Sequence, residues 1–413
     1  GNPTGRSGKW KARGCFDVSV DELMQNIIAK NSGEFYEFGH HQSHAANAFF
    51  SSNFKSAIIV TIDGGGTETA GVATNFTIWK GEDNKIFPIK IFPFNTSINL
   101  GSFWDNACTK FGLSGGGPPI GSQAGTVMGM AALGDSAKYY NQVEQGIDIS
   151  TLMDGTEQTN FDIAAALQLF TENIIRNVIS DYIGSEDINL CISGGVSLNC
   201  VMVGKIQEWF PNIKNIHADN VPSDSGLSVG SARYLYHHVL DNPRIEWKDD
   251  ASPYLGKIYT ESDIHSAITN YDNIISEVVT DDIVIDLLDK QNIISVFGGG
   301  SESGRRALGN RSIIADPRSL TMKDLINKKV KHRQWFRPFA PSILKEHVKD
   351  WFDRDVNSPY MSFAIPFKKE MKEKVPAVVH FDGTARLQTV TENNNPWYYN
   401  FIKKWYNKTN VPI

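Results

Sequence analysis

The chain has 413 residues, a length that suggests two domains and allows a third. Hydrophobic residues make up 41% of it and charged residues 21%, as in an ordinary globular enzyme. The formal net charge of −6 argues against sequence-independent binding of nucleic acid, and no apolar run is long enough to span a bilayer.

The cysteines give no sign of a metal cluster or a disulfide framework. Cys15, Cys108, Cys191 and Cys200 have neither zinc-type nor redox-type spacing. The sequence also has no signal peptide with a basic start and an apolar centre. We therefore expect a cytoplasmic protein.

The first half of the chain alternates predicted strands and helices. A helix is expected in HHQSHAANAFF, which starts at His40, and the β-branched run 57–62 predicts a strand that is buried on both faces. That strand should end in a glycine turn at Asp63 and return over residues 71–79 as a hairpin. An amphipathic helix is expected from about 160 to 182.

A second buried strand is predicted at 188–192. It is followed by the glycine turn Ser193-Gly-Gly195 and by a helix that ends at Trp209. A strand, a glycine turn and a helix in succession are typical of α/β folds that bind nucleotides. The fold class expected from the sequence is therefore α/β.

The composition changes between Asp241 and Lys257, where two prolines occur and few large apolar residues are found. We place a linker there, with one domain over residues 1–245 and a second over 246–413. In the second domain, residues 293–297 should form a strand. Neither end of the chain has a complete predicted element, so each domain is expected to lack a terminal part.

Two histidines and two aspartates form a candidate metal site. His40 and His44 have the i, i+4 spacing that stacks two imidazoles on one helical face. Asp63 follows a buried strand, and Asp224 precedes a helix of small residues. Such a set suits Fe(II), Mn(II) or Zn(II). Spacing alone leaves other readings open: a surface or core histidine pair, a turn-forming Asp63, and a helix cap at Asp224.

Two glycine turns could bring backbone N–H groups close to a phosphate. Glycine turns follow strands in many α/β folds, and neither turn contains the lysine of a Walker loop. The candidate nucleotide-binding residues in these turns are Gly64, Gly65, Gly66, Ser193, Gly194, Gly195 and Asn199.

Arginines are concentrated among Gly, Pro and Ser residues at 303–312, 331–342 and 382–388. Guanidinium groups bind phosphate oxygens in pairs and stay charged at any relevant pH. We expect anion binding by Arg306, Arg337 and Arg386. For Arg305, Arg311 and Arg333, pairing with acidic residues elsewhere in the fold is the alternative.

Seven segments in chain order resemble the motifs of the NodU/CmcH carbamoyltransferases. They are HHQSHAANAFF, TIDGGGTE, AGTVMGMAALG, CISGGVSLN, SGRRALGNRSIIADPR, MKDLINKKVKHRQWFRPFAPSIL and DGTARLQTV. The resemblance implies an ASKHA-type lobe, similar to that of enzymes for tRNA threonylcarbamoylation, followed by a YrdC-like lobe.

The resemblance also implies a function. The enzyme would form carbamoyladenylate from carbamoyl phosphate and ATP, and would then transfer the carbamoyl group to a hydroxyl of a small-molecule acceptor. Fe(II) or another divalent metal would be the cofactor, and Mg(II) is an additional candidate. The implied metal ligands are His40, His44, Asp63 and Asp224. The residues implied to hold the phosphates are Arg306, Lys331, Arg337 and Arg386.

One departure from the family pattern affects the donor site: an arginine is replaced by Gly300, and another is gained at Arg305. The alternatives to the carbamoyltransferase are another ASKHA-fold transferase or kinase, such as a tRNA threonylcarbamoyl-type enzyme, and an inactive homologue that binds a nucleotide or a metal. The expected partner is the small-molecule acceptor, without a membrane or nucleic acid. A homodimer is compatible with the sequence, which does not specify the oligomeric state.

Overall fold

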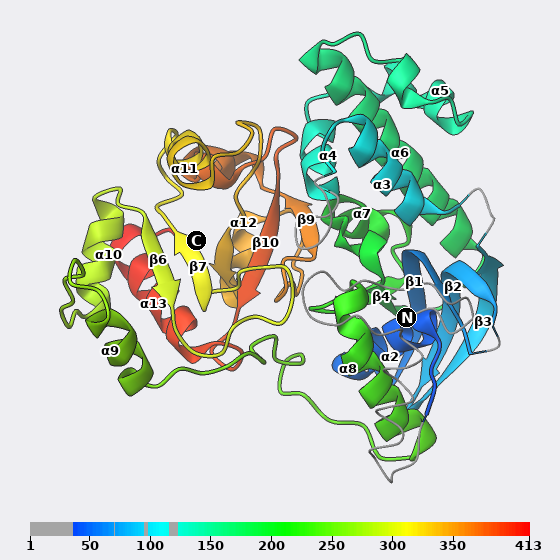
Figure 1. Ribbon diagram of the computed structural model, residues 1–413, viewed down its shortest axis with the longest axis horizontal. Coiled ribbons are helices and arrows are strands. Elements are labelled where there is room, and N and C mark those ends of the chain that lie inside the picture. The colour runs from blue at the N-terminus through cyan, green and yellow to red at the C-terminus, as the bar shows by residue number, and fades with distance from the viewer. Residues whose placement is uncertain (1–35, 70, 95–97, 115–122) are drawn as a thin grey trace.

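The computed structural model describes residues 36–69, 71–94, 98–114 and 123–413, and it has a mixed α/β fold (Figure 1). Its largest sheet has the strand order β3-β2-β1-β4-β5. Strands β1, β4 and β5 run parallel, whereas β1, β2 and β3 form an antiparallel meander. The strands are β1 (Ser56–Thr67), β2 (Ala73–Glu82), β3 (Lys85–Pro93), β4 (Ile188–Ser193) and β5 (Ile213–Ala218).

Helices cover both faces of this sheet. On one face, Ile59 and Cys191 belong to the same apolar cluster as Phe49 of α2. On the other face, Val60 clusters with Ile175 of α6, together with side chains of α7. The predicted helix 160–182 and the strand 188–192 are confirmed as α6 and β4. The helices are α2 (His40–Ser51), α3 (Leu100–Lys110), α4 (Ala124–Ala131), α5 (Tyr140–Glu144), α6 (Glu157–Ser180), α7 (Cys200–Trp209) and α8 (Leu227–Arg233).

The predicted glycine turn after residue 62 is wrong, because β1 continues to Thr67. The hairpin with β2 is confirmed, but the pairing of the two strands shifts between Ile62 and Gly66. Gly65 lies inside this irregularity with a φ of 145°, a value that side chains rarely adopt. The glycines therefore allow the strand to bulge and continue.

A second group of elements follows α8 and an extended segment (Figure 1). One sheet has the order β8-β10-β9, and β6 pairs antiparallel with β7. The predicted strand 293–297 is confirmed as β6. The strands are β6 (Ile294–Phe297), β7 (Arg311–Ile314), β8 (Ser342–Leu344), β9 (Phe363–Pro366) and β10 (Thr384–Val390). The helices are α9 (Glu261–Thr269), α10 (Asp281–Asp289), α11 (Met322–Ile326), α12 (Val348–Trp351) and α13 (Pro396–Thr409).

The two groups share a hydrophobic core. Leu190 of β4 and Met202 of α7 belong to one apolar cluster with Ile343, Ile365 and Leu387 of the second group. The segment 241–257, predicted as a linker, contains neither helix nor strand. A division into domains at 245/246 stays a prediction. No helix in the described ranges has both the length and the apolar character needed to cross a bilayer.

Candidate functional site

Two histidines and two aspartates from three separate elements converge beside the carboxyl end of β1. His40 and His44 lie one turn apart on α2, Asp63 comes from β1, and Asp224 follows β5. The His44 Nε2 atom is 3.1 Å from Asp63 Oδ2 and 3.6 Å from Asp224 Oδ1. The His40 Nε2 atom is 3.9 Å and 3.6 Å from the same two oxygens. One ligand atom from each residue lies within 4.8 Å of all the others.

The two imidazoles have unsatisfied polar atoms directed at this cluster. The Nε2 atoms of His40 and His44 are buried, and neither has a hydrogen-bond partner. Buried polar atoms without a partner are costly, so an orphaned pair in one place indicates a missing ligand. Two imidazole nitrogens and two carboxylate oxygens are the donors that Fe(II), Mn(II) and Zn(II) accept. The residues therefore fit a divalent metal ion, although they do not select one.

Neighbouring carboxylates change the protonation of the cluster. Burial lowers the pKa of His44, but the carboxylates of Asp224 and Asp63 close to its ring outweigh the burial and raise the pKa to about 9. The pKa of Asp63 is held well below its usual range, because its contacts with His40 and His44 outweigh its own burial. A cation bound between these groups would therefore take the place of a proton.

Two of the candidate glycines hold Asp63 in place. The Gly195 N–H donates to Asp63 Oδ2 at 3.0 Å, and the Gly64 N–H donates to Asp63 Oδ1 at 2.5 Å. Gly194, with a φ of 93°, lies against the backbone of Ile62. The glycine segment of β1 and the glycine turn after β4 therefore meet at a metal-ligand candidate, and their contact with a nucleotide stays a prediction.

The remaining candidates in these turns have structural contacts. Ser193 is fully buried at the end of β4. The Asn199 side chain caps α7 by accepting from the Met202 N–H at 3.1 Å, and its amide donates to Gln168 at 2.8 Å. Gly65 packs near Phe94. Ser193, Asn199 and the glycines of β1 line neither of the two cavities described for this structure, so no shared nucleotide pocket is formed there by these residues.

A single methyl group at Gly66 should disrupt the metal site. A Cβ added there would lie 2.1 Å from the ring of His40, whereas a Cβ at Gly64 would have 3.9 Å of clearance. We expect Gly66→Ala to weaken Co(II) binding by at least about tenfold, as displaced metal ligands do. Isothermal titration calorimetry would measure this, with Gly64→Ala as the matched control. Equal affinities of the two variants would show that the His40 ring is not a ligand.

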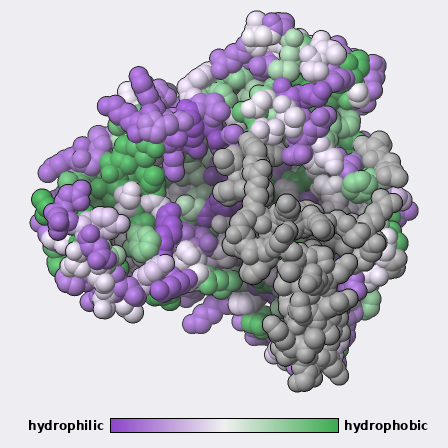
Figure 2. Space-filling model, in the orientation of Figure 1, coloured by the Kyte–Doolittle hydropathy of each residue, from purple (hydrophilic) through white to green (hydrophobic). Residues whose placement is uncertain are grey.

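The second site is a cavity of about 460 Å³. All four residues predicted to hold phosphates line it: Arg306, Lys331, Arg337 and Arg386. Met128 of α4 and Cys200 of α7 also reach the cavity, so both groups of elements contribute to its wall. Figure 2 shows that the surface is hollowed between the two groups.

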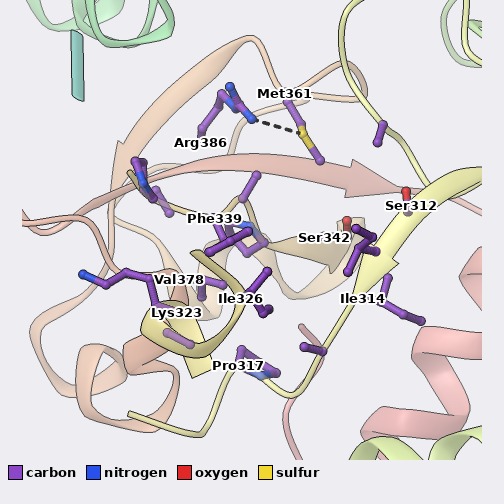
Figure 3. Close-up of a pocket in the computed structure, with 18 of the residues that line it drawn as sticks. Ser312, Ile314, Pro317, Lys323, Ile326, Phe339, Ser342, Met361, Val378 and Arg386 are labelled. Atoms are coloured by element: carbon purple, nitrogen blue, oxygen red, sulfur yellow. Dashed lines mark hydrogen bonds between the residues drawn. The ribbon is translucent and has the colours of Figure 1, made fainter. Parts of the chain in front are cut away.

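The arginines of this cavity have no acidic partner. Arg306, Arg333, Arg337 and Arg386 form no ion pair within the described part of the chain; the arginine ion pairs there belong to Arg318 and Arg354. The Nε atom of Arg386 is buried without any hydrogen-bond partner, and its Nη2 atom is 4.0 Å from Met361 Sδ (Figure 3).

Three arginines were expected to bind either an anion or an acidic residue, and the structure gives none of them an acidic partner among the described residues. Arg333 donates to the Asn327 side chain at 2.7 Å and to the Pro338 carbonyl at 3.2 Å. Arg311 donates to backbone carbonyls, including that of Asn310 at 2.8 Å. Arg305 lines the cavity beside Arg306.

Burial and mutual repulsion disfavour the charged form of these arginines. Burial, followed by the charge of Arg386, lowers the pKa of Arg306 to about 9. Burial and the charge of Arg337 lower the pKa of Arg333 to about 10. The pKa values of Arg337 and Arg386 are also lowered, mainly by burial. A bound anion would relieve the repulsion, so the electrostatics of this cavity, called the anion cavity below, favour an anion.

One part of the cavity wall is apolar, although polar side chains such as Ser312, Lys323 and Ser342 also line the cavity. Figure 3 shows Ile314, Pro317, Ile326, Phe339 and Val378 around the space beneath Arg386. Such an arrangement suits a ligand with a charged end and a flat apolar end. This apolar wall could not be predicted from the sequence, because apolar residues at strand and helix spacing are indistinguishable from ordinary core residues.

Comparisons with known proteins agree with these observations. Residues 136–233 match the family model described as carbamoyltransferase N-terminus, and residues 285–413 match that described as carbamoyltransferase C-terminus. The nodulation protein NolO of Bradyrhizobium diazoefficiens is 30% identical over 412 residues, which cover 91% of this chain and 71% of NolO.

Other similar proteins are also longer than this chain. The nodulation protein NolNO of Sinorhizobium fredii is 31% identical, and the match covers 95% of this chain but 61% of NolNO. An uncharacterised protein of Synechocystis, sll1178, is 31% identical, with 89% of this chain and 68% of that protein covered. Among solved structures, T. kodakarensis HypF matches with a TM-score of 0.39 and 14% identity, over 53% of this chain and 39% of HypF.

Proposed function

The chain belongs to the carbamoyltransferase family of transferase enzymes, and from this we propose that it is an O-carbamoyltransferase that modifies a small hydroxyl compound. The proposal is carried by the unpaired arginines, which line one cavity while a separate His/Asp cluster fits a metal. The arginines would neutralise the phosphate groups of the donor and of ATP, and a metal held by the His/Asp cluster would stabilise the charge that develops on the reacting carbonyl.

In the proposed first step, carbamoyl phosphate, ATP and one water give carbamoyladenylate, pyrophosphate and phosphate. Water cleaves carbamoyl phosphate to carbamate and phosphate. A carbamate oxygen then attacks the α-phosphorus of ATP, and pyrophosphate leaves. Arg306, Lys331, Arg337 and Arg386 would bind the phosphate oxygens, and Mg(II) could accompany the nucleotide. The apolar wall at Phe339 would take the adenine ring.

In the proposed second step, the acceptor hydroxyl attacks the carbamoyl carbon of the adenylate and AMP leaves. His40, His44, Asp63 and Asp224 would hold a divalent metal, Fe(II) or another. When bound, such an ion supplies Lewis-acid polarisation of a carbonyl or phosphoryl oxygen. The backbone N–H groups of Gly64 and Gly195 orient Asp63 within this set.

We further propose that the two steps divide between an ASKHA-type lobe over residues 1–245 and a YrdC-like lobe over 246–413. The parallel strands β1, β4 and β5 support the first assignment, because α/β folds bind ligands at the carboxyl ends of such strands. Asp63 belongs to β1 and Asp224 follows β5, so both lie toward that edge.

The test is release of AMP and pyrophosphate from ATP. We expect pyrophosphate only when carbamoyl phosphate is present, with one phosphate formed per pyrophosphate, and AMP once an acceptor hydroxyl or water attacks the adenylate. A kinase on this scaffold would form ADP instead, a tRNA threonylcarbamoyl-type enzyme would require tRNA, and an inactive homologue would form neither nucleotide product. Formation of AMP that does not depend on carbamoyl phosphate would contradict the proposal.

A further inference from the structure

A third polar cluster lies outside both sites and joins three elements. Ser51 Oγ is 2.9 Å from His217 Nε2, and His217 Nδ1 is 3.3 Å from Asp250 Oδ1. The carboxylate can only accept, so Nδ1 donates to Asp250 and Nε2 faces the serine hydroxyl. The order of groups is that of a serine nucleophile, its base and an orienting acid.

Burial excludes that nucleophilic role. The exposure of Ser51 is 0% and that of His217 is 5%, and neither residue lines a described cavity. The serine hydroxyl also lies 2.7 Å from the carbonyl of Asn47 in its own helix. A substrate therefore has no access to Ser51, and the cluster must act through the elements that it connects.

At one end the cluster contacts elements that carry the metal ligands. Ser51 is the last residue of α2, which presents His40 and His44 near its start. His217 lies on β5, and the chain reaches Asp224 shortly after that strand. A shift of Asp250 would therefore act on a helix and a strand that both lead to the His/Asp cluster.

At its other end the cluster contacts the segment 357–361. The second oxygen of Asp250 accepts from the Asn357 amide at 2.7 Å. Thr389 of β10 donates to Asn357 Oδ1 at 3.3 Å and accepts from the Ser358 N–H at 2.9 Å. Met361, at the end of the segment, contacts Arg386 in the anion cavity.

We propose that Ser51, His217, Asp250 and Asn357 form a relay that couples the metal site to the anion cavity. Its inner part, Ser51 and His217, is buried and its outer contact, Asn357, is exposed; the buried hydrogen bonds are either made or broken together, because a half-satisfied buried chain is costly. A ligand that favours the made state at one site therefore raises affinity at the other, and the effect is reciprocal. The relay rests on the proposed function only in requiring that both sites bind their ligands.

The test measures phosphate affinity with and without metal. Co(II) is the metal probe and inorganic phosphate is the anion probe, with calorimetry as the readout. In the unmodified chain, saturation with Co(II) should lower the phosphate Kd by about fivefold or more. Asp250→Asn should bring the ratio of the two Kd values to within about twofold of one, because an asparagine has one acceptor oxygen and cannot accept from both His217 Nδ1 and the Asn357 amide.

Two further variants make the outcome decisive. Asn357→Ala removes an exposed contact of the relay, so it should fold and should also lose the coupling. Asp355→Asn is the matched control, because Asp355 pairs with Lys345 outside the relay, and its ratio should equal that of the unmodified chain. Coupling that persists in Asn357→Ala, or two ligands that bind without coupling in the unmodified chain, would overturn the relay. Failure of both probes to bind would instead overturn the proposed function.

Discussion

Replacing His44 with alanine is expected to abolish carbamoyl transfer while leaving adenylate formation intact. His44 is fully buried, and its Nε2 atom lies within 3.6 Å of oxygens from both aspartates, so its loss removes a central ligand. We expect transfer of radiolabelled carbamoyl to an acceptor to fall at least about 100-fold. ATP–pyrophosphate exchange in the presence of carbamoyl phosphate should stay within about twofold of the unmodified rate.

His41 supplies the control for this prediction. It is buried beside His44 on the same helix, but its Nδ1 atom pairs with Thr61 Oγ1 at 2.9 Å, outside the candidate ligand set. The His41→Gln variant should therefore still bind Co(II), even if its folded state is less stable. If His44→Ala and His41→Gln lost transfer equally, the effect would be one of folding.

Replacing Arg386 with alanine is expected to have the opposite effect: adenylate formation is lost, and the metal site stays intact. Its guanidinium lines the anion cavity, and its Nε atom has no hydrogen-bond partner. Within the described part of the chain, Arg386 forms no ion pair; the arginine ion pairs there belong to Arg318 and Arg354. A preorganised donor of this kind typically contributes about 100- to 1000-fold to a rate. We expect ATP–pyrophosphate exchange to fall by that factor, while the Co(II) affinity of the His/Asp cluster stays unchanged.

Arg354→Ala separates this effect from the general loss of an arginine. Arg354 is ion-paired to Glu208 at 3.0 Å and does not line the cavity. It should retain exchange activity. Arg386→Lys keeps the charge but loses the fork that binds two oxygens, so an intermediate rate is expected. Normal exchange in Arg386→Ala would remove this residue from the donor site.

The sequence predicted those parts of the fold that depend on local periodicity. The helix α6, the strand β4 and the hairpin of β1 with β2 follow from apolar spacing and from turn residues. The bulge at Gly65 did not follow, because it lies where the strand packs against other elements: a Cβ at the neighbouring Gly66 would meet the His40 ring, a contact that no local pattern records.

The same limit applies to the candidate sites. The i, i+4 spacing of His40 and His44 predicts a shared helical face, but Asp63 and Asp224 join them only because β1 and β5 lie in the parallel part of one mixed sheet. For the cavity, clustering of arginine with glycine and proline indicated the cations. The relay through His217 and Asp250 has no sequence pattern, since its members are distant along the chain and ordinary in type.

The most direct test of the account is a crystal of the full chain grown with Co(II) and examined by anomalous scattering. We predict one strong peak bounded by His40 Nε2, His44 Nε2, Asp63 and Asp224, with metal–ligand distances of about 2.0–2.2 Å. A strong peak elsewhere, with these four side chains free of metal at saturating Co(II), would contradict it.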